Sequence, residues 1–140
     1  MFLLDTNVLS AVMGSRPVPE VAAWVAAQPE EQLFTTSVCQ AEILAGVAVM
    51  PDGRRRRGLE AAAKAIFASA FDGRILPFDE TSAEFYAEIF ATRRRAGKPT
   101  ATTDLMIAAI ARAQGADMVT RNTADFEGCG LTLINPWEMP

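Results

Sequence analysis

Short apolar runs alternate with longer stretches of helical periodicity along this chain. Five of these runs are typical of strands, at residues 2–4, 33–35, 74–78, 118–120 and 131–134. Between them, apolar residues recur three and four positions apart, as on one face of a helix. Strands that alternate with helices predict an α/β fold with a mostly parallel sheet and right-handed crossovers. We expect a single domain over residues 1–140, because no linker-like segment divides the chain.

Polar residues at the starts of these periodic stretches predict where helices begin. Ser37 with Gln40, and Thr81 with Glu84, have the spacing of a capping box. The apolar positions in residues 59–71 predict one long helix between the second and third strands.

Composition narrows the functional classes. Half of the 140 residues are hydrophobic and the formal net charge is −4. No apolar run approaches the ~18 residues that a membrane span needs, and Asp5 interrupts the first apolar run at once. We therefore expect a cytoplasmic protein without membrane contact. Cys39 and Cys129 are far apart and lack metal-site spacing, so we expect buried or idle thiols.

The chain contains no histidine. This excludes Ser-His-Asp and Cys-His catalysis and nearly all zinc chemistry. Any catalysis must therefore use carboxylates, hydroxyls, Lys or Arg side chains and a hard cation.

Four acidic residues occupy equivalent positions around the predicted strands. Asp5 follows the first strand, Glu42 lies early in the helix after the second, Asp104 begins a helix, and Asp125 follows the fourth strand. Parallel strands end at the same edge of a sheet, so these side chains can converge there. The competing interpretation makes Asp5 and Asp104 helix caps, Glu42 a surface acid and Asp125 a turn residue.

Convergence would require a cation. Two carboxylates 4 Å apart repel by roughly 4 kcal/mol at an effective dielectric of 20, a large part of the ~5–15 kcal/mol stability of a domain. Oxygen ligands without imidazole favour Mg²⁺ or Mn²⁺, which can activate water to attack a phosphodiester.

Local basic clusters would then bring nucleic acid to an acidic protein. The candidates for phosphate contacts are Arg54, Arg55, Arg56, Arg57, Arg93, Arg94, Arg95 and Lys98. Each cluster is equally explained as a solvated helix end.

Several segments of the chain resemble PIN-domain ribonucleases, specifically VapC-like toxins of bacterial type II toxin–antitoxin pairs and their FitB-like branch. The resemblance extends over the whole chain. The acidic segments that carry it are LLDTNVLS at 3–10, TSVCQAEILAG at 36–46, TTDLMIAAIA at 102–111 and VTRNTADF at 119–126. GRILPFDE at 73–80 and NPW at 135–137 are similar to the FitB-like branch.

This resemblance implies a three-layer PIN-like fold whose five-stranded sheet has the order 3-2-1-4-5. It implies metal binding by Asp5, Glu42, Asp104 and Asp125, with Mg²⁺ or Mn²⁺ as the cofactor. Some relatives carry their fourth acid where this chain has Asn122, so either Asn122 or Asp125 completes the site. The residues expected to support these acids by hydrogen bonds are Thr6, Asn7, Ser37, Thr120 and Asn122.

The implied activity is a metal-dependent endoribonuclease that cleaves single-stranded segments of structured RNA with a metal-activated water, leaving 5′-phosphate and 3′-hydroxyl ends. The implied partner is a small antitoxin with a DNA-binding part and a C-terminal segment that crosses the acidic site. A homodimer, or a higher assembly with the antitoxin, is also expected.

Two other functions remain open at this point. A non-catalytic PIN-like subunit could sustain a DNA-binding repressor complex, although the acids at all four positions argue against it. A phosphoacceptor switch would place its acceptor at Asp79, but it also needs paired acids after the first strand and a Lys after the last, which the chain lacks.

Overall fold

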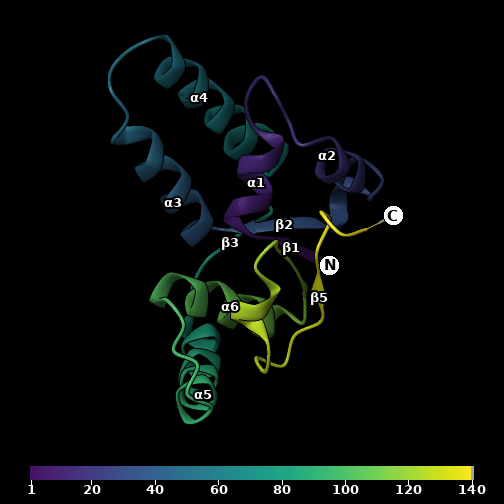
Figure 1. Ribbon diagram of the computed structural model, residues 1–140, viewed down its shortest axis with the longest axis vertical. Coiled ribbons are helices and arrows are strands. Elements are labelled where there is room, and N and C mark those ends of the chain that lie inside the picture. Colours follow the sequence, from purple (N-terminus) through teal and green to yellow (C-terminus); the bar gives the residue numbers. More distant parts are fainter. Residues whose placement is uncertain (140) are drawn as a thin grey trace.

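The computed structural model describes residues 1–139, and its centre is a parallel five-stranded sheet (Figure 1). The strands are β1 (Phe2–Leu4), β2 (Leu33–Thr36), β3 (Ile75–Leu76), β4 (Asp117–Val119) and β5 (Leu133–Ile134). Every neighbouring pair is parallel, and the order is β3-β2-β1-β4-β5. This confirms the α/β fold class and the strand order that the family resemblance implied.

β1 is the middle strand, and it pairs with β2 on one side and β4 on the other. In this register Leu3 lies opposite both Phe34 and Met118. The chain adds β2 and β3 on one side of β1, then crosses to β4 and β5 on the other. Ligands of open α/β sheets bind where the order reverses in this way, at the carboxyl ends of β1 and β4.

Helices cover both faces of the sheet (Figure 1). One layer holds α1 (Thr6–Val12), α2 (Pro19–Ala26), α3 (Ser37–Ala48) and α4 (Arg54–Ala65), and the other holds α5 (Glu80–Arg95) and α6 (Thr102–Gln114). Shorter helices are η1 (Glu30–Gln32), η2 (Ile66–Ala70) and η3 (Thr123–Phe126). None of these described helices is long and apolar enough to cross a membrane.

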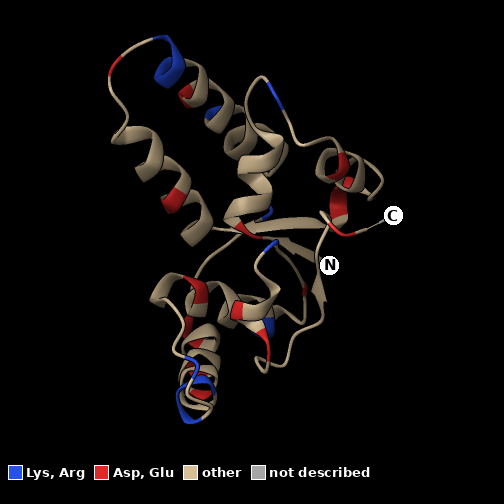
Figure 2. Cartoon of the chain, in the orientation of Figure 1, with Lys and Arg blue, Asp and Glu red and all other residues tan. Residues whose placement is uncertain are grey.

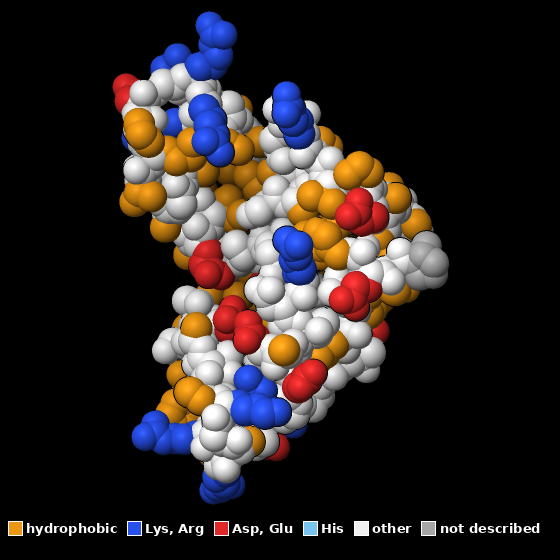
Figure 3. All heavy atoms as spheres, viewed as in Figure 1, with side chains coloured by type: hydrophobic (Ala, Val, Ile, Leu, Met, Phe, Trp, Pro, Cys, Tyr) orange, Lys and Arg blue, Asp and Glu red, His pale blue; other side chains and the backbone are white. Residues whose placement is uncertain are grey.

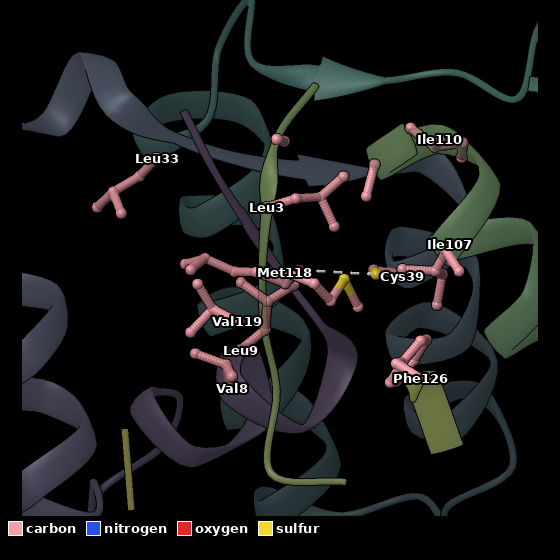
Figure 4. Packing of buried hydrophobic residues seen from close by; sticks show 14 of the residues in the cluster. Leu3, Val8, Leu9, Leu33, Cys39, Ile107, Ile110, Met118, Val119 and Phe126 are labelled. Atoms are coloured by element: carbon pink, nitrogen blue, oxygen red, sulfur yellow. Dashed lines mark hydrogen bonds between the residues drawn. The ribbon is translucent and has the colours of Figure 1, made fainter. Parts of the chain in front are cut away.

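The core lies on both faces of the central strands. Leu3 is fully buried and points toward Ile107 and Ile110 of α6 (Figure 4). The Cys39 thiol is also buried and donates a 3.7 Å hydrogen bond to the carbonyl of Leu4. Burial raises the pKa of this thiol to about 11, and Asp5 adds to the rise, so Cys39 is an inert core residue.

Two helix starts differ from the sequence prediction. Thr36, not Ser37, caps α3: its hydroxyl accepts a 3.0 Å hydrogen bond from the amide of Cys39. Asp79 caps α5, and its carboxylate accepts hydrogen bonds from the amide and hydroxyl of Ser82, so Thr81 is not the cap. In both cases the capping residue directly precedes the helix.

The helix expected over residues 59–71 begins earlier, at Arg54, and its last turn is the π-helix η2. The four consecutive arginines therefore form the first turn of α4. This turn lies at the far end of the α3–α4 pair, where Figure 2 shows a basic cluster.

Candidate active site at the carboxyl edge of the sheet

Three of the four predicted acids line one pocket at the carboxyl ends of β1 and β4. Asp5, Glu42 and Asp104 come from three different elements and face a cavity of about 550 Å³. Figure 3 shows acidic side chains on either side of the hollow between α3 and the α5–α6 pair. Residues far apart in the sequence thus meet where the strand order reverses.

Asp5 is the innermost of these acids, with 4% of its surface exposed. Its main chain continues the sheet, since its amide donates to Val119 O at 3.0 Å. Its carbonyl oxygen accepts the first backbone hydrogen bonds of α1. One carboxylate oxygen accepts from the amide of Thr6 at 2.8 Å. Burial raises the pKa of Asp5 to about 6; hydrogen bonds from Thr120 and Thr6 lower it, and the charges of Asp104 and Glu42 raise it further.

Thr120 and Asn7 support the other oxygen of Asp5. The fully buried Thr120 hydroxyl donates to Asp5 Oδ2 at 2.8 Å, and Asn7 Nδ2 lies 3.5 Å from the same oxygen. Thr120 Oγ1 also accepts from the amide of Asn122 at 3.2 Å, and Asn7 Oδ1 accepts from the amide of Arg121 at 3.3 Å. The segment after β4 is therefore tied to Asp5 through two side chains.

Glu42 and Asp104 face Asp5 from the two helix layers. Glu42 lies on α3, and its Oε1 accepts a 2.7 Å hydrogen bond from the hydroxyl of Thr6. Asp104 lies in the first turn of α6. Burial raises the pKa of Asp104, and so do the charges of Asp125 and Glu42. The pocket therefore concentrates negative charge that the described residues only partly balance.

Asn122 and Asp125 occupy different positions relative to the pocket. Asn122 lines it, whereas the exposed Asp125 lies on η3 and is close enough to Asp104 to affect its pKa. The amide of Asp125 donates to Asn122 O at 3.1 Å, so the two residues share one turn. Asn122 therefore lines the pocket itself, whereas Asp125 acts on it through its charge beside Asp104.

The remaining predicted residues do not line the pocket. Ser37 is exposed at the start of α3, and none of the hydrogen bonds found in residues 1–139 joins its side chain to the acids. The two basic clusters lie at opposite ends of the molecule, at the beginning of α4 and the end of α5 (Figure 2). Within them, Arg56 pairs with Glu60 at 2.9 Å and Arg94 lies over the ring of Phe90.

Arg93 contradicts its predicted role as a phosphate contact. Only 6% of its surface is exposed. Its guanidinium donates to Thr100 Oγ1 at 2.9 Å, to Glu127 O at 2.9 Å and to Ala124 O at 3.5 Å. Arg93 therefore joins two segments. One leads into α6, the helix that carries Asp104, and the other is the turn that carries Asp125.

Arg121 and Trp137 also line the pocket, although neither was predicted as a site residue. Arg121 directly follows the buried Thr120, at the same edge of the sheet as the acids. That position was a usable signal. Trp137 belongs to the NPW segment at 135–137, whose family resemblance implied no site role, and it reaches the pocket because it follows β5.

The pocket suits a hydrated magnesium-class ion in its chemistry. Its acidic side chains offer only oxygen atoms as donors. Burial and mutual repulsion raise the pKa of Asp5 and of Asp104, and a divalent ion in the pocket would lower both pKa values again. In residues 1–139, however, no three ligating side chains are arranged as a ready metal cluster. Mg²⁺ usually keeps several waters and binds through one or two carboxylates, so an open acidic pocket is compatible with it.

A parallel sheet of this order, with acids after β1 and on α3 and α6 at its switch point, defines the class of the protein. The chain belongs to the PIN domain family, whose model matches residues 2–127. It is similar to two named relatives along nearly its whole length. VapC ribonuclease Y4jK of Sinorhizobium fredii is 40% identical over 99% of both chains, and toxin FitB of Neisseria gonorrhoeae is 35% identical over 98% of this chain and 99% of that one. A solved structure of FitAB bound to an IR36 DNA fragment contains a chain that is 34% identical, with a TM-score of 0.92, covering 100% of this chain and 98% of that one.

Proposed function

We propose that this protein is a metal-dependent endoribonuclease that acts as the toxin of a toxin–antitoxin pair. The observation that carries the proposal is the pocket in which Asp5, Glu42 and Asp104 converge. The family and the similarity to a VapC ribonuclease and to toxin FitB support it. We expect the substrate to be a single-stranded segment of structured RNA.

Asp5, Glu42 and Asp104 would hold a Mg²⁺ or Mn²⁺ ion, with Asn122 or Asp125 completing the site. Such an ion supplies an activated water and offsets the charge that develops on the phosphoryl oxygens. The protein contributes the orientation of the carboxylates: Thr120 and the Thr6 amide fix both oxygens of Asp5, and the Thr6 hydroxyl fixes Glu42. These contacts fix the orientation of Asp5 and Glu42 within the pocket.

The test is cleavage of a 5′-labelled RNA by the purified chain with Mn²⁺. Asp104→Asn should reduce the rate about 100-fold or more, because it removes a ligand charge from the pocket. Asp72→Asn, in an exposed turn, makes the same chemical change away from the pocket and should leave the rate unchanged. Equal cleavage by wild type and Asp104→Asn, or cleavage that persists in EDTA, would contradict the proposal.

We further propose that a small antitoxin binds beside the acidic pocket. An apolar groove of about 310 Å³ lies between α1, α3 and α4, and Figure 3 shows hydrophobic side chains in this hollow. Thr6, Ser10 and Glu42 line both the groove and the acidic pocket. One partner segment could therefore fill the groove and cover the acids, in agreement with the full-length similarity to the chain in the FitAB structure.

Growth arrest and its relief test this partner. Expression of the chain alone should arrest growth, and co-expression of the small protein encoded beside it should restore growth. Leu59→Glu, in the groove, should preserve the arrest and prevent the relief. Val49→Glu is the control, because Val49 is 83% exposed and does not line the groove. Relief that is equal for both variants would exclude this groove.

A further inference from the structure

The acidic pocket has one basic and aromatic wall. In the part of the chain that the structure describes, Arg121 is the single Lys or Arg that lines the pocket, and Trp137 lies beside it. The guanidinium carbon of Arg121 is 5.3 Å from the centroid of the Trp137 ring. The pair comes from two different segments, one after β4 and one after β5.

Hydrogen bonds hold this pair in a fixed position relative to the acids. Asn135 Nδ2 donates to Arg121 O at 3.4 Å, and Asn135 Oδ1 accepts from the amide of Trp137 at 2.9 Å. The amide of Arg121 donates to Asn7 Oδ1, and Asn7 lies against Asp5. The Arg–Trp pair and the innermost acid are thus connected through Asn7.

The side chains themselves remain accessible. Arg121 is exposed and Trp137 is partly exposed. Unpaired bases stack on aromatic rings and on guanidinium planes, and a cation beside carboxylates reduces their repulsion of a phosphate. The two properties that a nucleotide needs on approaching an acidic pocket are therefore combined in one pair.

We propose that Arg121 and Trp137 form a platform that binds one unpaired nucleotide of the substrate, with the base stacked on the pair and its phosphate directed toward the carboxylates. This inference rests on the proposed ribonuclease function and assigns its substrate-binding residues. The competing explanation is that the pair only fastens the C-terminal segment to the body of the protein.

Binding of RNA with and without bases distinguishes the two explanations. The probes are a fluorescently labelled single-stranded RNA of about twelve nucleotides and the same backbone with abasic sites. Binding is measured by anisotropy in the Asp104→Asn background, so that cleavage does not interfere. The platform should bind the RNA with bases about tenfold more tightly than the abasic strand. Arg121→Gln should bring this ratio close to one, and Trp137→Leu should do the same.

Three controls keep the result interpretable. Lys64→Gln removes one exposed charge from α4 and should leave the ratio unchanged. Trp137→Phe retains an aromatic ring and should keep most of the preference for bases. Arg121 is exposed, so its substitution should not unfold the protein, whereas the folding of Trp137→Leu must be checked by thermal unfolding.

Two further readouts belong to the platform alone. The chain has two tryptophans, and RNA should quench the fluorescence of Trp137 in wild type but not the remaining signal of Trp137→Phe. In the active enzyme, Arg121→Gln should raise KM about tenfold and change kcat less than twofold.

Equal binding of the RNA and the abasic strand by the protein with Arg121 and Trp137 intact, or no binding of either strand, would overturn the inference. Cleavage by wild type with equal binding of both strands would overturn the platform while leaving the ribonuclease function intact.

Discussion

The hydroxyl of Thr120 donates a 2.8 Å hydrogen bond to Oδ2 of Asp5, across 115 positions of sequence. Both residues are buried, and they follow the two central strands of the sheet. Strand pairing therefore delivers the donor directly to the innermost acid.

Thr120→Val keeps the shape of this side chain and removes its donor. It should destabilise the protein by about 1–2 kcal/mol, because the carboxylate of Asp5 and the amide of Asn122 each lose a partner. It should also raise the pKa of Asp5 further, since this hydrogen bond lowers it. Urea unfolding and a carbon NMR titration measure the two effects. Thr120→Ser retains the hydroxyl, and a loss as large as that of the valine variant would refute this explanation.

The raised pKa of Asp5 makes stability depend on pH. The unfolded value is 3.8 and the folded value about 6, so between these pH values the folded state binds more protons and stability falls as pH rises. Asp5→Asn removes this titration. Its free energy of unfolding, relative to wild type, should increase by about 3 kcal/mol between pH 3.5 and pH 7. Denaturant unfolding across this range is the measurement, and a pH-independent difference would contradict the assigned cause.

Manganese should counteract this loss, because an ion at the proposed site would bind the deprotonated carboxylates. At ten times its dissociation constant, the ion should stabilise the folded state by about 1.4 kcal/mol, and by less at pH 5 than at pH 7. The measurement is the melting temperature with and without Mn²⁺. Asp5→Asn should lose most of the effect and Asp72→Asn should retain it; an identical response of the two variants would exclude binding at this pocket.

Arg93 should matter both for stability and for the proposed metal binding at the acidic pocket. Arg93→Met leaves the hydroxyl of Thr100 and the carbonyl of Glu127 without their donor and should cost about 2–4 kcal/mol. It should also raise the Mn²⁺ concentration needed for half-maximal stabilisation, because the segments with Asp104 and Asp125 lose their shared anchor. Arg95→Met makes the same change on the exposed side of the same helix end and is the matched control. Unfolding by urea with a manganese titration would show whether the two variants differ.

The fold was predictable because its signals are local. Each strand is a short apolar run and each helix repeats apolar residues on one face, so their alternation was evident. The exact caps were less accessible. Thr36 and Ser37 are adjacent hydroxyl residues, and Thr36 is the cap because β2 continues through it with an extended backbone and α3 begins at Ser37.

The candidate site was predictable where its residues follow strands. Asp5 directly follows β1, so the parallel arrangement places it at this edge, whereas Asp104 follows no strand and begins the helix that leads into β4. Arg93 was misplaced because three arginines follow one another, although Ile89, four positions earlier, marks the buried face of the same helix. The contact between Arg121 and Trp137 depends on the tertiary fold, so no spacing in the sequence indicated it.

The acids of this pocket are spread from position 5 to position 104, and the turn with Asp125 lies further along the chain. During synthesis on the ribosome, the first hundred residues carry only Asp5 and Glu42, and β4, which supplies the neighbour of β1, has not yet emerged. The growing chain therefore lacks the assembled acidic pocket until β4 has paired with β1. The pocket on which the proposed activity depends can therefore form only late in synthesis.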